Sequence, residues 1–356
     1  MLSTISNINL MRKPVAAAAP TDTPATYWLA FGPGTNSIKK ITPAPLISNW
    51  SSVSPSTNMF TSYGYHGATN GTGTWIATGS GTNTMVKSTD NGTTWVAYNS
   101  ASSFAASGFK IAYGNNMFVV SGGSGESNGV NIRTLDNAGT NVGSYTGYFA
   151  SYAWCANYIK GLWYVGGTGA GSTPGFTSAS PLVVSSTNAA TSWSKTLTPG
   201  LANSINDIST DGTRIIISGT NASGSNSISS TKISTNASTW TDCTINGVRL
   251  FDNGYKSDYG NGVWITVGVP VGASGQCIAR STDNGTTWSY VGNGILSSGF
   301  GVAYGGNSTW VAVGSKATSG QNAAISTDNG ATWTGRGFPS NGSTDVIYGI
   351  ASNYIP

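Results

Sequence analysis

Short apolar runs of about five residues recur along the chain, separated by stretches rich in Gly, Ser, Thr and Asn. Near the C-terminal end, one such run at 300–304 is followed by a Gly/Asn turn and by further runs at 309–314 and 323–325, with a fourth beginning near Trp333. Runs of this length bounded by turn residues are typical of β-strands. This segment is therefore predicted to form a unit of four strands.

The second strand of this unit has a pattern that can be followed through the chain. It recurs at 75–79, 118–122, 163–166, 215–219 and 264–268. We therefore expect six complete units between about residues 54 and 338. Self-similarity at a period of about 45–50 residues is typical of stacked or radial arrays of small β units.

The two ends of the chain supply parts of one further unit. Residues 345–351 resemble a first strand with no second strand after it, whereas residues 27–32 resemble a second strand with no first strand before it. Residues 37–41 and 49–50 continue that unit. A stacked solenoid would need capping repeats at its ends, but a ring closes by joining such a split unit, which removes an open sheet edge.

The predicted fold is all-β, a seven-bladed β-propeller of four-stranded blades closed by its C-terminal strand. The propeller would span residues 26–356, with the seventh blade shared between 26–53 and 343–356. One miscounted degenerate unit would change the number of blades to six or eight.

A string of eight residues precedes the fourth strand in three units, at 88–95, 281–288 and 326–333, and reads Ser-Thr-Asp-Asn-Gly-(Thr/Ala)-Thr-Trp. The Asp and Ser side chains can accept backbone N–H bonds within a turn, Gly permits positive φ, and Trp offers an apolar plate to the neighbouring blade. Counting degenerate copies, the predicted structural positions are Ser88, Asp90, Gly92, Trp95, Asp136, Trp193, Trp240, Ser281, Asp283, Gly285, Trp288, Ser326, Asp328, Gly330 and Trp333.

The string resembles the Asp-box of BNR-repeat proteins, which include sialidases and many other propellers, and the resemblance covers most of the chain. For a sialidase it would imply an arginine triad, a Tyr nucleophile assisted by Glu, and an Asp acid/base. Here Arg133 and Arg280 directly precede turn repeats, and Glu126 is the single Glu in the chain. We therefore expect a sialidase-like fold without the sialidase catalytic residues, and no enzymatic activity.

A propeller glycoside hydrolase or lyase acting on a surface polysaccharide is the alternative. Such chemistry commonly needs two carboxylates, which Asp207 with Asp211, or Asp252 with Asp258, could supply. The sole histidine, His66, has no accompanying nucleophile elbow, and too few His and Cys residues are present for a zinc site with several such ligands. We predict no metal and no cofactor, and we interpret Cys155, Cys243 and Cys277 as buried thiols.

Composition narrows the class of partner. Only 8% of residues are charged, whereas 12 Trp, 16 Tyr and 10 Phe supply ample apolar area for a core. A net charge of +4 without a basic cluster does not predict a nucleic-acid partner, and no apolar segment approaches the length of a membrane span. Weakly charged surfaces rich in hydroxyl and amide groups are common on extracellular and virion proteins.

Aligning the first strands predicts a ligand site at the mouth of the central channel. The aligned ring contains His66, Lys110, Trp154, Asn206, Lys256, Gly301 and Gly349, and the position before it includes Tyr65, Phe109 and Tyr255. Aromatic faces beside amides and cations suit a neutral glycan; alternatively, the aromatics wedge between blades and the polar ring holds water. The long loops at 122–131, 166–181, 219–230, 269–276 and 315–322 are expected on the same face and could carry recognition.

Residues 1–25 do not join the repeat pattern and fit a signal peptide poorly. The apolar residues Leu2, Ile5, Ile8, Leu10 and Met11 suggest an arm that docks on another subunit or chain; the alternative is that it packs on its own propeller. We expect a non-catalytic virion protein of a phage tail, fibre or capsid. The arm would anchor it to other virion proteins, within an assembly that could include further copies, and the loops would face a host surface or glycan.

The sequence also allows another location and another role for the protein. A secreted or cell-surface location would suit the same composition. A soluble assembly factor is a further alternative, because photosystem II assembly factors are similar BNR-like propellers, although the basic surface patch expected of them is not evident in this sequence.

Overall fold

The computed structural model describes residues 24–33, 37–41, 51–52, 59–98, 104–123, 129–169, 181–187, 192–197, 201, 204–220, 229–272, 274–317, 320–337 and 346–354. The predicted docking arm, with Leu2, Ile5, Ile8, Leu10 and Met11, lies outside these residues except for its last two positions. The regular elements within them are all β-strands, as the sequence predicts. No helix long and apolar enough to cross a membrane occurs among them.

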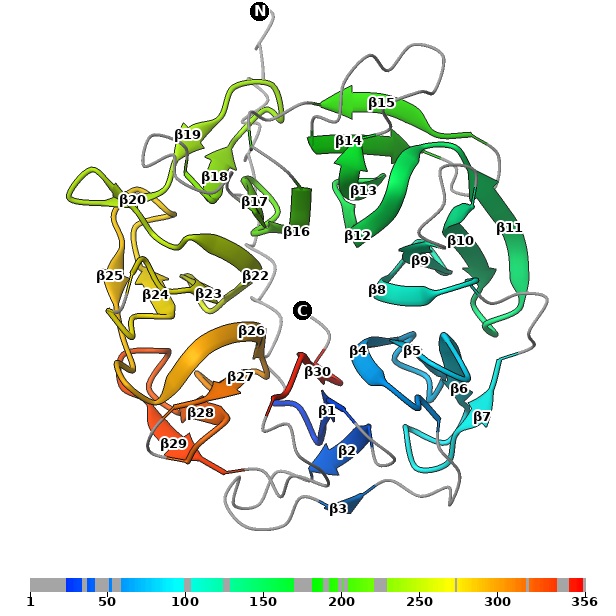
Figure 1. Cartoon of the computed structure of the whole chain (residues 1–356), viewed down its shortest axis with the longest axis horizontal. Coiled ribbons are helices and arrows are strands. Elements are labelled where there is room, and N and C mark those ends of the chain that lie inside the picture. The colour runs from blue at the N-terminus through cyan, green and yellow to red at the C-terminus, as the bar shows by residue number, and fades with distance from the viewer. Residues whose placement is uncertain are drawn as a thin grey trace, which may run out of the picture.

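The strands form four-stranded antiparallel units arranged radially around a central channel (Figure 1). Three consecutive units are β4 (Tyr63–Thr69), β5 (Trp75–Ser80), β6 (Met85–Ser88) and β7 (Val96–Ala97); β8 (Ser107–Gly114), β9 (Met117–Gly123), β10 (Val130–Asp136) and β11 (Asn141–Thr146); and β12 (Phe149–Ile159), β13 (Leu162–Gly169), β14 (Pro181–Ser186) and β15 (Ser194–Leu197). The next are β16 (Ser204–Thr210), β17 (Ile215–Thr220), β18 (Thr231–Ser234) and β19 (Thr241–Asp242); β22 (Asn253–Gly260), β23 (Val263–Val269), β24 (Ile278–Ser281) and β25 (Ser289–Tyr290); and β26 (Leu296–Tyr304), β27 (Trp310–Lys316), β28 (Ala323–Ser326) and β29 (Thr334–Arg336). A short hairpin that the sequence pattern did not predict, β20 (Thr244–Ile245) with β21 (Val248–Arg249), lies between two of these units.

The two ends of the chain contribute adjacent strands to one sheet. Its order is β3 (Ser51–Ser52), β2 (Ile38–Ile41), β1 (Trp28–Phe31) and β30 (Gly349–Ser352). In the antiparallel register, Trp28 lies opposite Ser352 and Phe31 opposite Gly349. The Asn353 side chain also accepts the Thr26 and Tyr27 N–H groups at 2.8 and 3.0 Å. The last strand is shorter than the predicted 345–351, because Tyr348 precedes it and Val346 bridges instead to Ser315 of the neighbouring unit.

The core lies between the units. Trp75, Trp163, Trp264 and Trp310 occupy the second strands and are fully buried. These strands read as continuous apolar runs because both of their faces are covered by neighbouring sheets. Burying one such indole contributes about 4–6 kcal/mol at roughly 25 cal/mol per Å² of apolar area. Closely packed neighbours are therefore a condition of each unit's stability.

The repeated Asp turns have the predicted internal hydrogen bonds. In the turn at 88–95, the Asp90 carboxylate accepts the Thr94 N–H at 2.8 Å and the Ser88 hydroxyl at 2.8 Å. The Gly92 N–H donates to the Ser88 hydroxyl, and Gly92 has a φ of 72°. The Trp95 indole donates to the Gly92 carbonyl and packs in the cluster that contains Leu29 and Phe31 of the neighbouring unit.

The other copies follow the same plan to different degrees. The turns at Asp283 and Asp328 reproduce it almost bond for bond, including the indole bonds of Trp288 to Gly285 and of Trp333 to Gly330. Asn236 replaces Asp in a degenerate copy and still accepts the Thr239 N–H at 2.9 Å. Another degenerate turn keeps one such bond, from the Thr140 N–H to Asp136 at 2.7 Å. Trp193 and Trp240 end degenerate copies as predicted, but their indole N–H groups have no partner among the described residues.

Replacing Asp328 with Ala should lower the free energy of unfolding by about 1–2 kcal/mol, because the turn loses several hydrogen bonds at once. Hydrogen bonds from Thr332 lower the pKa of Asp328 to about 2, from 3.8. This contribution should therefore be complete above pH 3.8 and be lost as the pH falls through about 2. Urea unfolding at several pH values measures both effects. Asp328→Asn, which mimics the natural turn at Asn236, is the matched control and should lose less.

Deleting residues 346–356 should lower the melting temperature by about 10 °C or more, because it removes the sheet partner of β1 together with the buried side chains of Ile347 and Ile350. Circular dichroism melting checks this. The control Ile350→Val keeps the strand and should cost only about 1 kcal/mol. An unchanged melting curve for the truncated chain would show that the β1–β30 pairing contributes little.

Candidate ligand cavity at the channel mouth

Six inner strands share a β-bulge at one position. Register shifts fall between Gly64 and His66, Gly108 and Lys110, Ala153 and Cys155, Ile205 and Asp207, Gly254 and Lys256, and Gly299 and Gly301. A bulge leaves one residue unpaired and redirects its side chain. The unpaired residues are Tyr65, Phe109, Trp154, Asn206, Tyr255 and Phe300.

These bulges correct the alignment expected from the sequence. Trp154 and Asn206 are equivalent to Tyr65 and Phe109, not to His66 and Lys110, so the predicted alignment is wrong by one residue in two units. The residues equivalent to His66 in those units are Cys155 and Asp207. The small or aliphatic residue immediately before each bulge is the signal that would have given the correct register, because Gly or Ala fills that position in five of the six strands.

Six aromatic side chains, here termed the aromatic collar, surround most of the channel mouth. All six are partly exposed. Neighbouring rings are in contact, with centroids 4.4–5.8 Å apart. In order around the channel, the collar consists of Trp154, Phe109, Tyr65, Tyr348, Phe300 and Tyr255.

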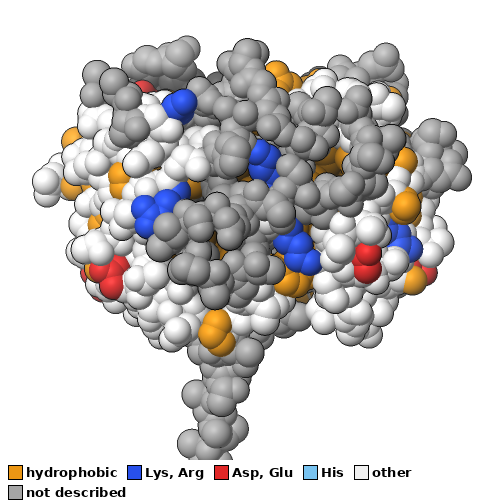
Figure 2. Space-filling view, turned by 90° about the horizontal axis from the view of Figure 1, so that it is seen from below, with side chains coloured by type: hydrophobic (Ala, Val, Ile, Leu, Met, Phe, Trp, Pro, Cys, Tyr) orange, Lys and Arg blue, Asp and Glu red, His pale blue; other side chains and the backbone are white. Residues whose placement is uncertain are grey.

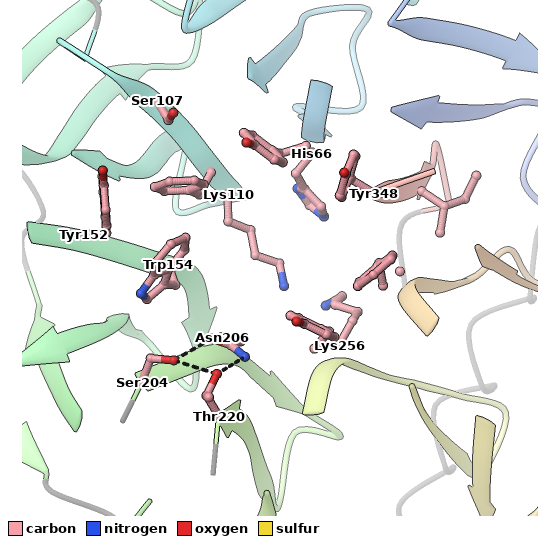
Figure 3. Close-up of a pocket in the computed structure, with 17 residues that line it drawn as sticks. His66, Ser107, Lys110, Tyr152, Trp154, Ser204, Asn206, Thr220, Lys256 and Tyr348 are labelled. Atoms are coloured by element: carbon pink, nitrogen blue, oxygen red, sulfur yellow. Dashed lines mark hydrogen bonds between the residues drawn. The ribbon is translucent and has the colours of Figure 1, made fainter. Parts of the chain in front are cut away.

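Asn206 occupies the gap between the two ends of the collar. Its amide nitrogen donates to the Gly254 carbonyl at 2.9 Å and to the Thr220 hydroxyl at 3.2 Å. Its amide oxygen accepts the Ser204 hydroxyl at 2.9 Å, so the three side chains form a small polar network at the cavity wall (Figure 3). The mouth therefore has an aromatic side and a hydrogen-bonding side.

The collar opens into a cavity of about 580 Å³. All eight predicted ligand residues line it: His66, Lys110, Trp154, Asn206, Lys256, Tyr65, Phe109 and Tyr255. The sequence pattern did not single out Ser107, Tyr152, Ser204, Thr220 and Ile350, which also line it. The structure thus brings the predicted residues together, and their role in ligand binding stays a prediction.

A buried ionic cluster forms the floor of this cavity. Asp207 is 1% exposed, and one of its oxygens accepts a short hydrogen bond from Lys110 and a longer one, at 3.4 Å, from Lys256. Its other oxygen accepts the Ser209 hydroxyl at 2.7 Å and the Ser257 N–H at 2.9 Å. Burial opposes ionisation of Asp207, but the two ammonium groups and these hydrogen bonds outweigh it and hold its pKa well below its ordinary value.

The ionic cluster joins strands that are far apart in the chain. Lys110 lies on β8, Asp207 on β16 and Lys256 on β22, so the Lys110–Asp207 bond spans 97 residues and skips the unit of β12–β15. Figure 3 shows the Lys110 side chain extending into the channel toward Lys256. The cluster therefore links different sides of the channel wall.

His66 shares this floor. Burial lowers its pKa well below the ordinary value, and the charges of Lys110 and Lys256 lower it further, so the imidazole is neutral at pH 7. Its Nδ1 atom is buried without a hydrogen-bond partner among the described residues. A second cavity of about 200 Å³ lies beyond it, lined by His66, Lys256 and Asp258 among others. His66 and Lys256 thus stand between two spaces along the channel.

The carboxylate pairs considered from the sequence do not meet as pairs. Asp211 accepts the Thr213 N–H at 2.7 Å in a turn and pairs with Arg214 at 3.0 Å, away from Asp207 in the channel wall. Asp252 pairs with Arg249 at the edge of its unit, whereas Asp258 faces the second cavity. Neither Arg, Asp nor Glu is among the described residues that line the larger cavity.

The part of the chain that the structure describes contains few other groups that could form a reactive or metal-binding site. Cys155, Cys243 and Cys277 are buried free thiols, which confirms their sequence interpretation. No group of three or more His, Cys, Asp or Glu in the described ranges could hold a metal ion. Among those ranges, the exposed large hydrophobic residues Tyr63, Val96, Val142 and Val248 lie on different strands or in separate units.

The described charged side chains are dispersed on one face of the molecule. On the face shown in Figure 2, the described charged side chains form small separate groups within a largely uncharged polar surface. Of the long loops predicted for recognition, the parts at 124–128, 170–180 and 221–228 lie outside the described residues, whereas most of 269–276 and 315–322 is described and does not line the cavity. Among the described residues, the collar and its cavity therefore form the candidate site.

No protein-family model and no curated protein matches the sequence. Among solved structures, the chain is similar to one described as "YCF48 bound to D1 peptide", with a TM-score of 0.49 and 11% identity. The similarity covers 76% of this chain and 81% of that one.

Replacing Asp207 with Ala should lower the free energy of unfolding by about 3–5 kcal/mol, because Lys110 and Lys256 would remain buried without their carboxylate. Urea unfolding at pH 7 measures the loss. The matched control is Asp242→Ala, which removes the exposed partner of Lys232 and should cost less than about 1 kcal/mol. Adding Lys110→Met to Asp207→Ala should recover part of the loss. Equal effects of Asp207→Ala and Asp242→Ala would contradict a stabilising role for the buried cluster.

Proposed function

We propose that this chain is a non-catalytic binding scaffold, a seven-bladed β-propeller closed by its C-terminal strand, whose channel mouth binds a saccharide. The observation that carries the proposal is the aromatic collar, placed by repeated bulges and completed by the Asn206 network. The antiparallel register between β1 and β30 supports the closed ring. A rigid ring suits this role because it holds the collar residues of different units in fixed positions.

The cavity has the properties that a saccharide site needs. Its volume of about 580 Å³ falls within the range of small-molecule sites. The partly exposed collar rings offer apolar surface to the faces of a sugar ring, and Asn206, Ser204 and Thr220 offer donors and acceptors to its hydroxyl groups. In the alternative, the aromatics wedge between blades and the polar ring holds water. Rings that served only as wedges would be buried, whereas all six collar rings are partly exposed and line the cavity.

A binding role is favoured over glycoside hydrolysis because two carboxylates must flank a scissile bond. The described lining of the larger cavity contains none. Asp207 lies beneath it, and both of its oxygens already accept hydrogen bonds from Lys110, Lys256, Ser209 and Ser257. A carboxylate held in this way is poorly suited to act as an acid or a base.

The setting in which this scaffold works is a separate part of the proposal. A virion attachment protein of the BNR-repeat type, displayed on a phage tail, fibre or capsid, fits the uncharged polar surface and the repeated Asp turns. Its anchor would be residues 1–25. Deleting residues 2–23 should leave saccharide binding intact while abolishing incorporation into particles, which co-purification with virions would measure.

The binding proposal is tested by the variant Phe109→Ala on an array of neutral and acidic saccharides. Loss of one collar ring should weaken saccharide binding by about tenfold, because apolar contact area is lost while the scaffold remains. Tyr113→Ala is the matched control, since Tyr113 lies on the same strand but does not line the cavity. Absence of any saccharide binding by the unmodified chain, or equal binding by the two variants, would refute the proposal.

A further inference from the structure

The floor of the cavity has more hydrogen-bond donors than acceptors. Two ammonium groups, Lys110 and Lys256, supply three N–H donors each, or six in total. The structure gives them three bonds: each lysine donates to Asp207, and Lys256 also donates to the Ser209 hydroxyl at 3.4 Å. Three N–H donors therefore remain for other acceptors in the channel.

Asp207 cannot supply those acceptors. One of its oxygens already takes both ammonium groups, and the other takes Ser209 and Ser257. A carboxylate has about four lone-pair directions in all, so this one is fully used. The excess donors must be satisfied by water or by a ligand that enters from the mouth.

Two lysines on this floor share one carboxylate. Lys110 and Lys256 both pair with Asp207; burial lowers the pKa of Lys110, and the charge of Asp207 opposes that effect. Asp258 is the other carboxyl group near Lys256 and lines the second cavity with it, so its charge helps to raise the pKa of Lys256. Burial raises the pKa of Asp258 itself, and its oxygens accept the N–H groups of Tyr259 and Tyr304 at 3.0 and 2.8 Å. His66 and Cys155, the other titratable groups facing the floor, are neutral at pH 7.

The two lysines reach the larger cavity itself. Both line it together with His66, and Figure 3 shows these side chains directed into the channel. The Lys110 and Lys256 side chains are only 10% and 16% exposed, so a charge bound here would be poorly screened by solvent.

We infer that the cavity floor binds the anionic group of the ligand, a carboxylate or a phosphate carried by a saccharide whose ring lies against the aromatic collar. This inference rests on the proposed function and refines it, because the sequence alone indicated a neutral glycan. A ligand with an acidic group on one side and a sugar face on the other would use both halves of the cavity.

The test is isothermal titration calorimetry of the full-length protein with glucuronic acid, glucose 6-phosphate and glucose. At least one acidic sugar should bind about tenfold more tightly than glucose, since a hydrogen bond to a charged group is stronger than one to a neutral group. Comparing the two acidic sugars distinguishes a carboxylate from a phosphate. Raising the salt concentration should weaken the preference less than for a surface site, because the lysines are largely buried.

Substitutions of Lys256 test whether the preference for an acidic sugar arises at the cavity floor. Lys256→Gln should remove the preference for the acidic sugar while leaving the Lys110–Asp207 pair in place, and Lys256→Arg should restore most of it. Lys160→Gln is the matched control, because Lys160 is exposed on the turn between β12 and β13, outside the cavity lining. Melting curves of all three variants report whether the fold is retained.

Three results would overturn the inference. Equal affinity for glucose and the acidic sugars would reject the anionic group while leaving saccharide binding intact. A preference that survives in a folded Lys256→Gln variant would place the anion elsewhere. Failure of all three sugars to bind, together with an array on which other neutral saccharides bind, would reject the anionic class without rejecting the proposed function.

Discussion

Each unit of this molecule can bury its second strand only between two neighbours. The indoles of Trp75, Trp163, Trp264 and Trp310 are covered on both sides by sheets that belong to different parts of the sequence. No single unit contains enough apolar surface to do this alone, so the units are stable as an array. The same packing directs the inner strands toward one axis, and the candidate site lies where those strands begin.

The candidate site depends on this packing and on a β-bulge in the inner strands. A regular inner strand would alternate its side chains between the two neighbouring units and would leave few of them facing the channel. The bulge repeated in six inner strands turns one residue of each strand out of this alternation. Five of these residues are aromatic, and Tyr348, just before β30, completes the collar on the remaining side.

The strands and turns could be predicted from the sequence because local patterns specify them. Runs such as 75–79 and 264–268 became β5 and β23 with small shifts at their ends, and the Asp turns formed the expected bonds. The site could be predicted only in part. Tyr65, Phe109 and Lys256 were placed correctly, whereas the bulges displaced Trp154 and Asn206 by one position. The role of Asp207 depends on Lys110, 97 residues away, and no local pattern indicates such a contact.

The position of β30 has a consequence for biosynthesis. The innermost strand of the first sheet is synthesised after all the other described strands, and Asn353, directly after it, contacts Thr26 and Tyr27 across more than 320 residues. Until then, β1 presents an unsatisfied edge while every other unit can already assemble. Such long-range contacts form slowly, so the exposed edge of β1 should leave nascent chains vulnerable to edge-to-edge association for much of their synthesis. Factors that shield exposed strand edges during translation would therefore matter more for this protein than for one whose sheets are each completed locally.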